Sequence, residues 1–251
     1  SERTLHEVFL PPYELSVRKG GAGSAMMAHN EINGVPCHSS KWLMEDVLRK
    51  EYGFDGFIVS DWMDIERLHN RQFTATSRKE AYYQSIMAGM DMHMHGIYWN
   101  EEVAELVREG RIPMSRIDES VRRILTAKFR LGLFENPYSN VAEGKKVRMC
   151  DEHRATALEA ARNSIVLVKN NGILPLDSKK YKRVLVTGIN ADDENIMGDW
   201  SAPQKPENVT TILEGLCEVA PKTEFIFVNQ GDTPKRMKQE NVDKAARIAR
   251  T

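Results

Sequence analysis

The chain of 251 residues is 41% hydrophobic and 28% charged, a composition typical of a globular protein with one large or two ordinary domains. Its 36 acidic and 35 basic residues give a formal net charge of −1, which argues against nucleic-acid or anionic-membrane binding, because such binding normally needs a basic surplus on one face. No stretch reaches the ~18 consecutive apolar residues of a membrane-spanning helix, and the three cysteines lack the spacing of a zinc site.

The first 135 residues alternate between strand and helix patterns. Three short apolar runs start about thirty residues apart, the length of a βα unit, and are predicted as strands: 24–29, 57–60 and 90–94. Helices with capping signals at Ser39 or Ser40, Ser77, Asn100 and Ser115 are predicted at 41–50, 77–88, 101–109 and 115–129. This alternation predicts an α/β fold with a parallel sheet, although three strands cannot close a barrel of eight.

A polar, turn-rich stretch at 136–146 predicts a linker. After it, strands are predicted at 165–168, 183–189 and 225–228, and helices at 152–161, 210–219 and 235–250, the last exposed and basic. We therefore expect domain-sized parts at 1–136 and 163–251, joined by a linker and helix at 137–162.

The strongest local signal lies at residues 53–62, where an acidic residue directly follows a buried strand. Asp61 is expected at the C-terminal end of that strand, where barrel enzymes place their reacting groups, and its carboxylate could act as a nucleophile, a general base or a metal ligand. The alternative is that Asp61 only caps the following turn or helix. Trp62 beside it could stack on a sugar ring, or simply belong to the core.

Histidines follow the other two predicted strands. His29 ends the first strand on the same rim as Asp61, either as a substrate contact or as a hydrogen-bonded structural residue. His93 and His95 point to one face of the third strand, but a zinc site would need a third ligand nearby. Gly188 alone after a strand falls short of a dinucleotide-binding motif, and the sequence has no phosphate loop. No metal and no organic cofactor is predicted.

Several segments, in order and with consistent spacing, together resemble family 3 glycoside hydrolases. They cover roughly residues 1–230 and are AHNEINGVPC at 28–37, GFDGFIVSDW at 53–62, AGMDM at 88–92, RRIL at 122–125, KFRLGLF at 128–134, NSIVLVKN at 163–170, GILPL at 172–176 and TILEG at 211–215.

The resemblance implies the C-terminal part of a (β/α)8-type barrel followed by the first part of an α/β sandwich domain. It also implies a retaining, exo-acting β-glycosidase of the β-glucosidase or β-xylosidase type, acting through a covalent glycosyl–Asp intermediate. Asp61 matches the family's catalytic nucleophile, and Trp62 and Arg67 match positions that line the neighbouring sugar subsite. His29 stands where many members carry a tyrosine, and its ring nitrogen can replace that hydroxyl as a donor. His95 replaces a common proline.

Other parts of the family pattern are not found in these residues. The family's Lys-His pair comes from earlier barrel strands, and no motif marks Asp192, Asp193 or Glu194 as the general acid, so none is assigned. We therefore expect a fragment that is inactive alone; the alternative is a non-catalytic carbohydrate-binding or assembly protein that keeps part of the fold. The expected partner is a β-linked oligosaccharide or glycoside, and the resemblance favours a periplasmic or secreted location. The sugar and the oligomeric state are left open.

Overall fold

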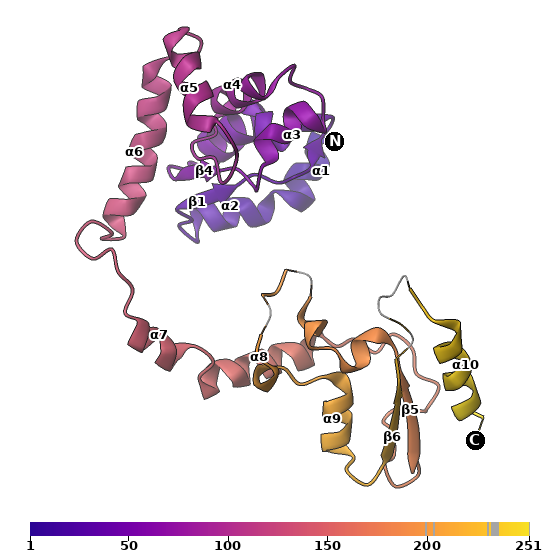
Figure 1. Ribbon diagram of the computed structural model, residues 1–251. Coiled ribbons are helices and arrows are strands. Elements are labelled where there is room, and N and C mark those ends of the chain that lie inside the picture. Colours follow the sequence, from indigo (N-terminus) through magenta and orange to yellow (C-terminus); the bar gives the residue numbers. More distant parts are fainter. Residues whose placement is uncertain (199, 203, 230, 232–235, 251) are drawn as a thin grey trace. The chain divides into compact units, whose positions relative to one another are not determined.

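A computed structural model describes residues 1–198, 200–202, 204–229, 231 and 236–250 (Figure 1). The chain divides into two compact units, Ser1–Cys150 and Asp151–Thr251, called here the first and second unit. Helices alternate with parallel strands in both, which confirms the predicted α/β class. The domain boundaries at 136 and 162 stay predictions. Among the described residues, no helix combines the length and apolar character needed to cross a membrane.

Helices dominate the first unit and surround short strands. Its elements are α1 (Glu2–Thr4), η1 (Leu5–Phe9), α2 (Pro11–Arg18), β1 (Ser24–Met26), β2 (Glu31–Ile32), β3 (Val35–Pro36), η2 (Cys37–Ser39), η3 (Trp42–Glu51), β4 (Phe57–Val59), α3 (Asp64–Asn70), α4 (Arg78–Ala88), α5 (Trp99–Arg108), α6 (Met114–Arg130) and α7 (Val141–Val147). The helix α7 lies partly within the stretch that the sequence predicted as a linker.

Strands β1 and β4 form a parallel pair, with Ser24 opposite Phe57 and Met26 opposite Val59. The pair needs a glycine before β4, because a Cβ on Gly56 would lie 2.2 Å from the carbonyl oxygen of Gly23. The two predicted strands are thus confirmed, and their C-terminal ends meet at one edge.

The third predicted strand, at 90–94, is wrong as a strand. The chain there forms only a single parallel bridge, between Val59 and Met92, and the Ser60 N–H donates to the Met92 carbonyl at 2.9 Å. The segment therefore runs beside β4 for too short a distance to be a strand. A β2–β3 hairpin, which the sequence analysis did not predict, turns at Asn33 and Gly34, both with positive φ.

Predicted helix positions are confirmed more often than the predicted capping residues. The Ser40 hydroxyl accepts from the Leu43 N–H at 3.3 Å, and the Ser77 hydroxyl accepts from the Glu80 N–H at 3.1 Å, as expected. The other two caps are wrong: α5 begins at Trp99, before Asn100, and α6 begins at Met114, before Ser115, so each proposed cap lies inside its helix.

Asp91, whose side chain is fully buried, ties β4 to the surrounding helices. Its carboxylate lies 2.6 Å from Arg49 Nη2 on η3 and 2.9 Å from Arg123 Nη1 on α6, with Arg116 at 3.3 Å. It also accepts from the Ile58 N–H at 3.0 Å. Burial lowers the pKa of Arg49, and the charge of Asp91 opposes that shift. One carboxylate thus fixes the strand that leads to Asp61.

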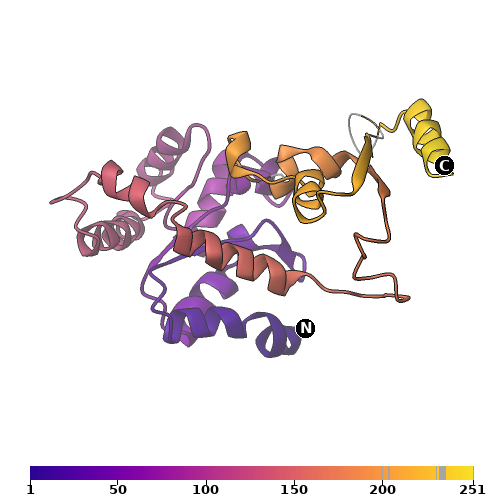
Figure 2. The same ribbon diagram turned by 90° about the horizontal axis from the view of Figure 1, so that it is seen from below.

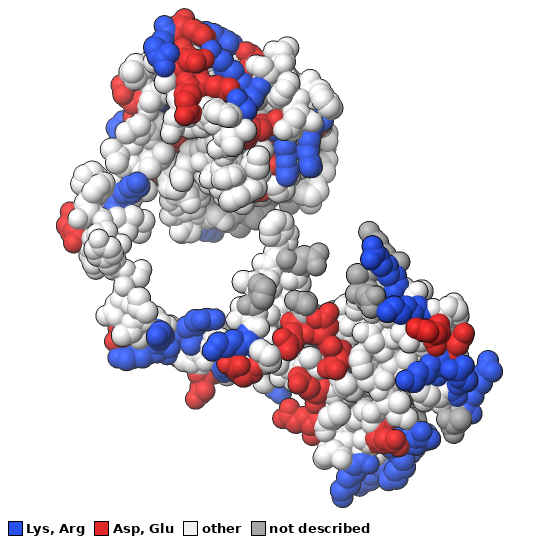
Figure 3. All heavy atoms as spheres, in the orientation of Figure 1, with Lys and Arg blue, Asp and Glu red and all other residues white. Residues whose placement is uncertain are grey.

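Charged side chains of both signs gather over α4 and α5 on the outside of the first unit (Figure 3). Lys79 on α4 lies 2.9 Å from Glu105 and 2.6 Å from Glu109, which belong to α5 and the residue after it. Arg78 pairs with Glu102 of α5 at 2.6 Å. These partly exposed pairs join the polar faces of the two helices, while their opposite faces pack on the core.

The second unit contains α8 (Asp151–Ser164), β5 (Arg183–Thr187), η4 (Ile189–Asp192), η5 (Glu194–Met197), η6 (Pro206–Asn208), α9 (Ile212–Val219), β6 (Glu224–Val228) and α10 (Gln239–Ile248). Strands β5 and β6 pair in parallel, with Arg183 opposite Glu224 and Thr187 opposite Val228. A capping box begins α9, in which the Thr211 hydroxyl and the Glu214 carboxylate each accept from the other's backbone N–H. The predicted strands and helices at these positions are confirmed; the first residue of the predicted basic helix, Lys235, lies outside the described residues.

The strand predicted at 165–168 is wrong. Figure 2 shows that α8 is followed by a coil with turns but without helix or strand, residues 165–182. All four residues of the apolar run, Ile165, Val166, Leu167 and Val168, are exposed. Strand propensity alone does not order this run, because an isolated strand gains no ladder hydrogen bonds and buries no face.

Candidate active site

The ends of β1 and β4 bring His29 and Asp61 together, as the sequence predicted for two residues on one rim. Asp61 follows β4 through Ser60, which is fully buried. The Ser60 hydroxyl donates to the Asp61 carbonyl at 3.0 Å and accepts from the Met94 N–H at 2.9 Å. The position of Asp61 is therefore determined by the strand and by the segment beside it.

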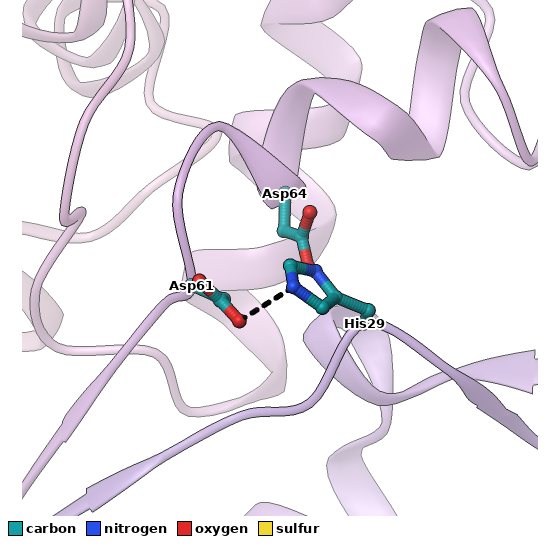
Figure 4. A group of neighbouring side chains, drawn as sticks. All are labelled: His29, Asp61 and Asp64. Atoms are coloured by element: carbon teal, nitrogen blue, oxygen red, sulfur yellow. Dashed lines mark hydrogen bonds and ion pairs between the residues drawn. The ribbon is translucent and has the colours of Figure 1, made fainter. Parts of the chain in front are cut away.

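Figure 4 shows the imidazole of His29 between two carboxylates. Its Nε2 lies 2.9 Å from Asp61 Oδ2, and its Nδ1 forms a short hydrogen bond with Asp64 Oδ2. The side chain of Asp61 is 20% exposed and that of His29 is 52% exposed, so a ligand can reach this edge. The second oxygen of Asp61, Oδ1, accepts from the Trp62 N–H at 2.6 Å.

Asp64 is the first residue of α3, and its side chain is only 2% exposed. Arg67, one helical turn later, lies 2.6 Å from Asp64 Oδ1 through Nη1, and the same nitrogen lies 3.0 Å from His29 Nδ1. Arg67 is therefore held by Asp64 at the site, with its side chain 30% exposed. The sequence analysis singled out Arg67 but not Asp64.

His38, buried on η2, supports the backbone of Asp61. Its Nε2 accepts from the Asp61 N–H at 3.0 Å, and its Nδ1 lies 3.9 Å from Asp64 Oδ2. Burial lowers the pKa of His38 to about 4, although the nearby carboxylates of Asp64 and Asp61 act in the opposite direction. His38 is thus neutral near pH 7, with its proton on Nδ1, which faces Asp64.

Trp62 lies beside Asp61 with its side chain largely exposed. Its ring stacks on His95, with ring centroids 4.0 Å apart and an interplanar angle of 12°. The Met63 N–H donates to the His95 carbonyl at 3.1 Å, which joins the two loops. One face of Trp62 is thus supported by His95, an arrangement suited to stacking on the flat face of a ligand.

His93 and His95, which were expected to share one face, have different surroundings. His93 Nε2 lies 3.2 Å from Glu66 Oε2, and the Tyr82 hydroxyl donates to Glu66 Oε1 at 2.7 Å. Burial tends to raise the pKa of Glu66, but the hydrogen bonds from His93 and Tyr82 outweigh it and lower the pKa. Burial also raises the pKa of Tyr82. His93 is therefore a structural residue behind the site, while His95 reaches its rim.

The residues His29, Asp61 and Asp64 each offer a ligand atom, and these atoms lie within 4.8 Å of one another. A cation could use such a spacing, but Arg67 already places a positive charge against Asp64. The arrangement can also act as a nucleophile: the Oδ1 atom of Asp61 accepts from the Trp62 N–H, and its Oδ2 atom lies 2.9 Å from the His29 ring with lone pairs left to reach a ligand.

Residues 1–127 match the family described as Glycosyl hydrolase family 3 N terminal domain, and residues 165–251 match Glycosyl hydrolase family 3 C-terminal domain. A beta-xylosidase of Formosa agariphila is 40% identical over 231 residues, covering 86% of this chain and 32% of that protein. A lysosomal beta glucosidase of Dictyostelium discoideum is 37% identical, covering 100% of this chain and 32% of that protein.

Solved structures give the same result. The beta-glucosidase from Listeria innocua in complex with glucose has a TM-score of 0.82 and 31% identity, over 100% of this chain and 34% of that one. A beta-glucosidase involved in saponin metabolism from intestinal bacteria has a TM-score of 0.83 and 32% identity, over 100% of this chain and 37% of that one. The chain thus spans about a third of the length of these relatives.

Proposed function

The chain belongs to glycosyl hydrolase family 3, and on that premise we propose that the protein containing it is a retaining, exo-acting β-glycosidase of the β-glucosidase or β-xylosidase type. Its substrates are terminal β-linked sugars of oligosaccharides or glycosides. The observation that carries the proposal is the carboxylate of Asp61, which is partly exposed at the end of β4 and oriented by His29 and by the Trp62 N–H. Relatives named beta-xylosidase and beta-glucosidase support this substrate class.

In the proposed reaction Asp61 is the nucleophile. A carboxylate oxygen attacks the anomeric carbon, and the glycosidic bond breaks with its electron pair going to the leaving oxygen, which takes a proton from a partner carboxyl group. Water then attacks the anomeric carbon of the glycosyl ester and gives one proton to the partner carboxylate, which had lost its own in the first step, while the Asp61 carboxylate leaves. The hydrogen bond from the Trp62 N–H and the contact with His29 hold the oxygens of Asp61 in place for both steps.

His29, Trp62 and Arg67 are proposed to line the sugar subsites around Asp61. The exposed ring of Trp62 offers an apolar face to the sugar next to the cleavage point, and Arg67 offers guanidinium donors to hydroxyl groups. The partner carboxyl group is not assigned; of the acidic residues considered for it, Asp192 accepts from the Thr211 hydroxyl at 3.0 Å within the second unit.

The proposal is tested by covalent trapping in the full-length protein that contains this chain. A 2-deoxy-2-fluoro glycoside with a good leaving group should label a peptide that contains Asp61, because the fluorine slows breakdown of the glycosyl ester. Asp61→Asn should abolish labelling and turnover while sugar binding persists. Label on another carboxylate would contradict the role of Asp61, and binding without any turnover would favour the non-catalytic alternative.

Residues 1–251 expressed alone are expected to be inactive on aryl β-glucosides and β-xylosides, because retaining hydrolysis needs a second carboxyl group at a defined distance from the first. Turnover of about one per second that disappears in Asp61→Ala would show that this part of the fold is sufficient by itself.

A further inference from the structure

Both ring nitrogens of His29 face carboxylate oxygens. Nε2 lies 2.9 Å from Asp61 Oδ2, and Nδ1 is hydrogen-bonded to Asp64 Oδ2. The two carboxylates differ in environment, since the side chain of Asp61 is 20% exposed and that of Asp64 is 2% exposed. His29 thus joins a buried acid on α3 to the acid that is proposed to attack the sugar (Figure 4).

Hydrogen-bond chemistry limits where the protons of this group lie. An ionised carboxylate only accepts, so the contact between His29 Nε2 and Asp61 requires a proton on Nε2. The contact between Nδ1 and Asp64 Oδ2 holds one further proton, placed on the nitrogen or on the oxygen. Either placement leaves Nε2–H directed at Asp61.

The charged and titratable groups around this contact support the same arrangement. Arg67 Nη1 lies 2.6 Å from Asp64 Oδ1 and 3.0 Å from His29 Nδ1, so it stabilises negative charge on Asp64. Neutral His38 turns its Nδ1 toward Asp64 Oδ2 at 3.9 Å. Asp64 is therefore held by Arg67, with His38 nearby, and it in turn determines the orientation of the half-exposed His29.

We propose, building on the proposed function, that Asp64 is a positioning residue that holds His29 with Nε2–H against Asp61, so that Asp61 departs more readily from the glycosyl ester. In the second step the bond between the anomeric carbon and the Asp61 oxygen breaks, and its electron pair becomes the carboxylate charge. The His29 Nε2–H, 2.9 Å from Asp61 Oδ2, stabilises that charge as it develops, and no proton passes to Asp61. In the first step the same contact stabilises the attacking carboxylate, so it does not lower that barrier.

The proposal predicts unequal effects on the two steps. The full-length protein is inactivated with 2,4-dinitrophenyl 2-deoxy-2-fluoro-β-glucoside, or with the corresponding xyloside if that sugar is the one hydrolysed, and the reactivation rate is then measured after the excess reagent is removed. Asp64→Asn should slow reactivation roughly 10- to 100-fold. This effect is smaller than that of removing a donor group itself, because the His29 ring is still present and only its orientation is loosened. Inactivation should change by less than about threefold in either direction, because the contact stabilises the attacking carboxylate and does not lower the first barrier.

Asp46→Asn is the matched control, because Asp46 makes an exposed pair with Lys50 at 2.7 Å on η3. It should leave both rates unchanged. The second variant is His29→Ala, which removes a half-exposed side chain and should slow reactivation at least as much as Asp64→Asn. The double variant of His29→Ala and Asp64→Asn should then be no slower than His29→Ala alone, because Asp64 acts through His29.

The outcomes separate this proposal from the proposed function. Without a trapped adduct on Asp61 in the unsubstituted protein, the proposed function fails and this inference fails with it. With a trapped adduct, equal slowing of both steps in Asp64→Asn would show a structural role or a displaced Arg67, which affects sugar binding in the first step as well. Additive effects in the double variant would also overturn the proposal.

Discussion

The two units of this chain differ in how far their apolar side chains are buried. In the first unit a continuous core includes Ile58, Ile65 and Tyr82 and joins strands to helices. In the described part of the second unit, the buried hydrophobic residues are Val186, Ala191, Val228 and Ala245, while the run at 165–168 is exposed. Helices and strands form in both units. Local sequence thus favours an element in either unit, whereas its burial, and at 165–168 its formation, depend on the neighbours that the fold supplies.

The two units should differ most in how much stability they lose when a paired carboxylate is neutralised. Asp91→Asn should lower the free energy of unfolding of the first unit by about 3–5 kcal/mol, because it leaves Arg49, Arg116 and Arg123 without their buried partner. Urea denaturation followed by tryptophan fluorescence measures it, since three of the four tryptophans lie in this unit. Glu224→Gln in the second unit removes an exposed pair with Arg183 and should cost about 1 kcal/mol or less. Equal losses would contradict the comparison.

The same substitution should have different costs in the two units. Ile58→Ala removes a fully buried side chain and is expected to cost about 2–5 kcal/mol, from lost burial and the cavity left behind. Ile165→Ala removes a side chain that is 78% exposed, so a change within about 0.5 kcal/mol is expected. The midpoint of thermal unfolding is measured for each variant and compared with that of the unsubstituted protein. A large loss for Ile165→Ala would show that this run packs in solution.

The first unit should also depend on pH through His38. Because its pKa is about 4 when folded, against an ordinary value near 6.5, the unfolded chain binds more protons between these values. Stability should therefore rise with pH, with roughly 3 kcal/mol lost as pH falls from 6.5 to 4. In His38→Gln, the free energy of unfolding, measured by denaturation at several pH values between 4 and 6.5, should vary much less with pH. His153→Gln, at an exposed position on α8, is the control and should leave the pH dependence as it was.

The smallest expected effect should be nearly the same in both units. Ser77→Ala and Thr211→Ala each remove a capping hydroxyl, at α4 and α9, and each should cost about 1 kcal/mol. Thr211→Ala should cost slightly more, since this hydroxyl also donates to Asp192 at 3.0 Å. Circular dichroism during denaturation measures both. A negligible effect in one unit only would show that caps, too, depend on the surrounding core.

The sequence allowed most elements to be predicted, because periodicity and capping are local. The strands at β1, β4, β5 and β6 and the main helices follow from such patterns. The errors arise where a partner decides the outcome, as in the runs at 90–94 and 165–168. The β2–β3 hairpin had a local signal that was not used, since Asn33-Gly34 between apolar residues is typical of a two-residue turn.

At the candidate site, the sequence predicted that His29 lies beside Asp61, but it did not predict the buried residues that hold these two in place. Parallel strands that end at one edge place His29 beside Asp61, and this pairing follows from the strand prediction. Asp64 and His38 were missed, because a polar residue in a turn or first helical turn is usually a solvated cap, and only the tertiary fold shows both to be buried. The spacing of Asp64 and Arg67, one helical turn apart, was a weak signal that they could pair.

The exposed run Ile165–Val168 has a consequence for handling the protein at high concentration. Its four residues are apolar, and three of them are β-branched. A short exposed segment of this kind can pair with the edge strand of another molecule's sheet. Arg162 precedes the run and Lys169 follows it. These cations oppose strand addition, because the same charges on two copies of the chain repel each other. We therefore expect self-association through this run to increase with ionic strength, since salt screens the two cations without weakening the apolar contact.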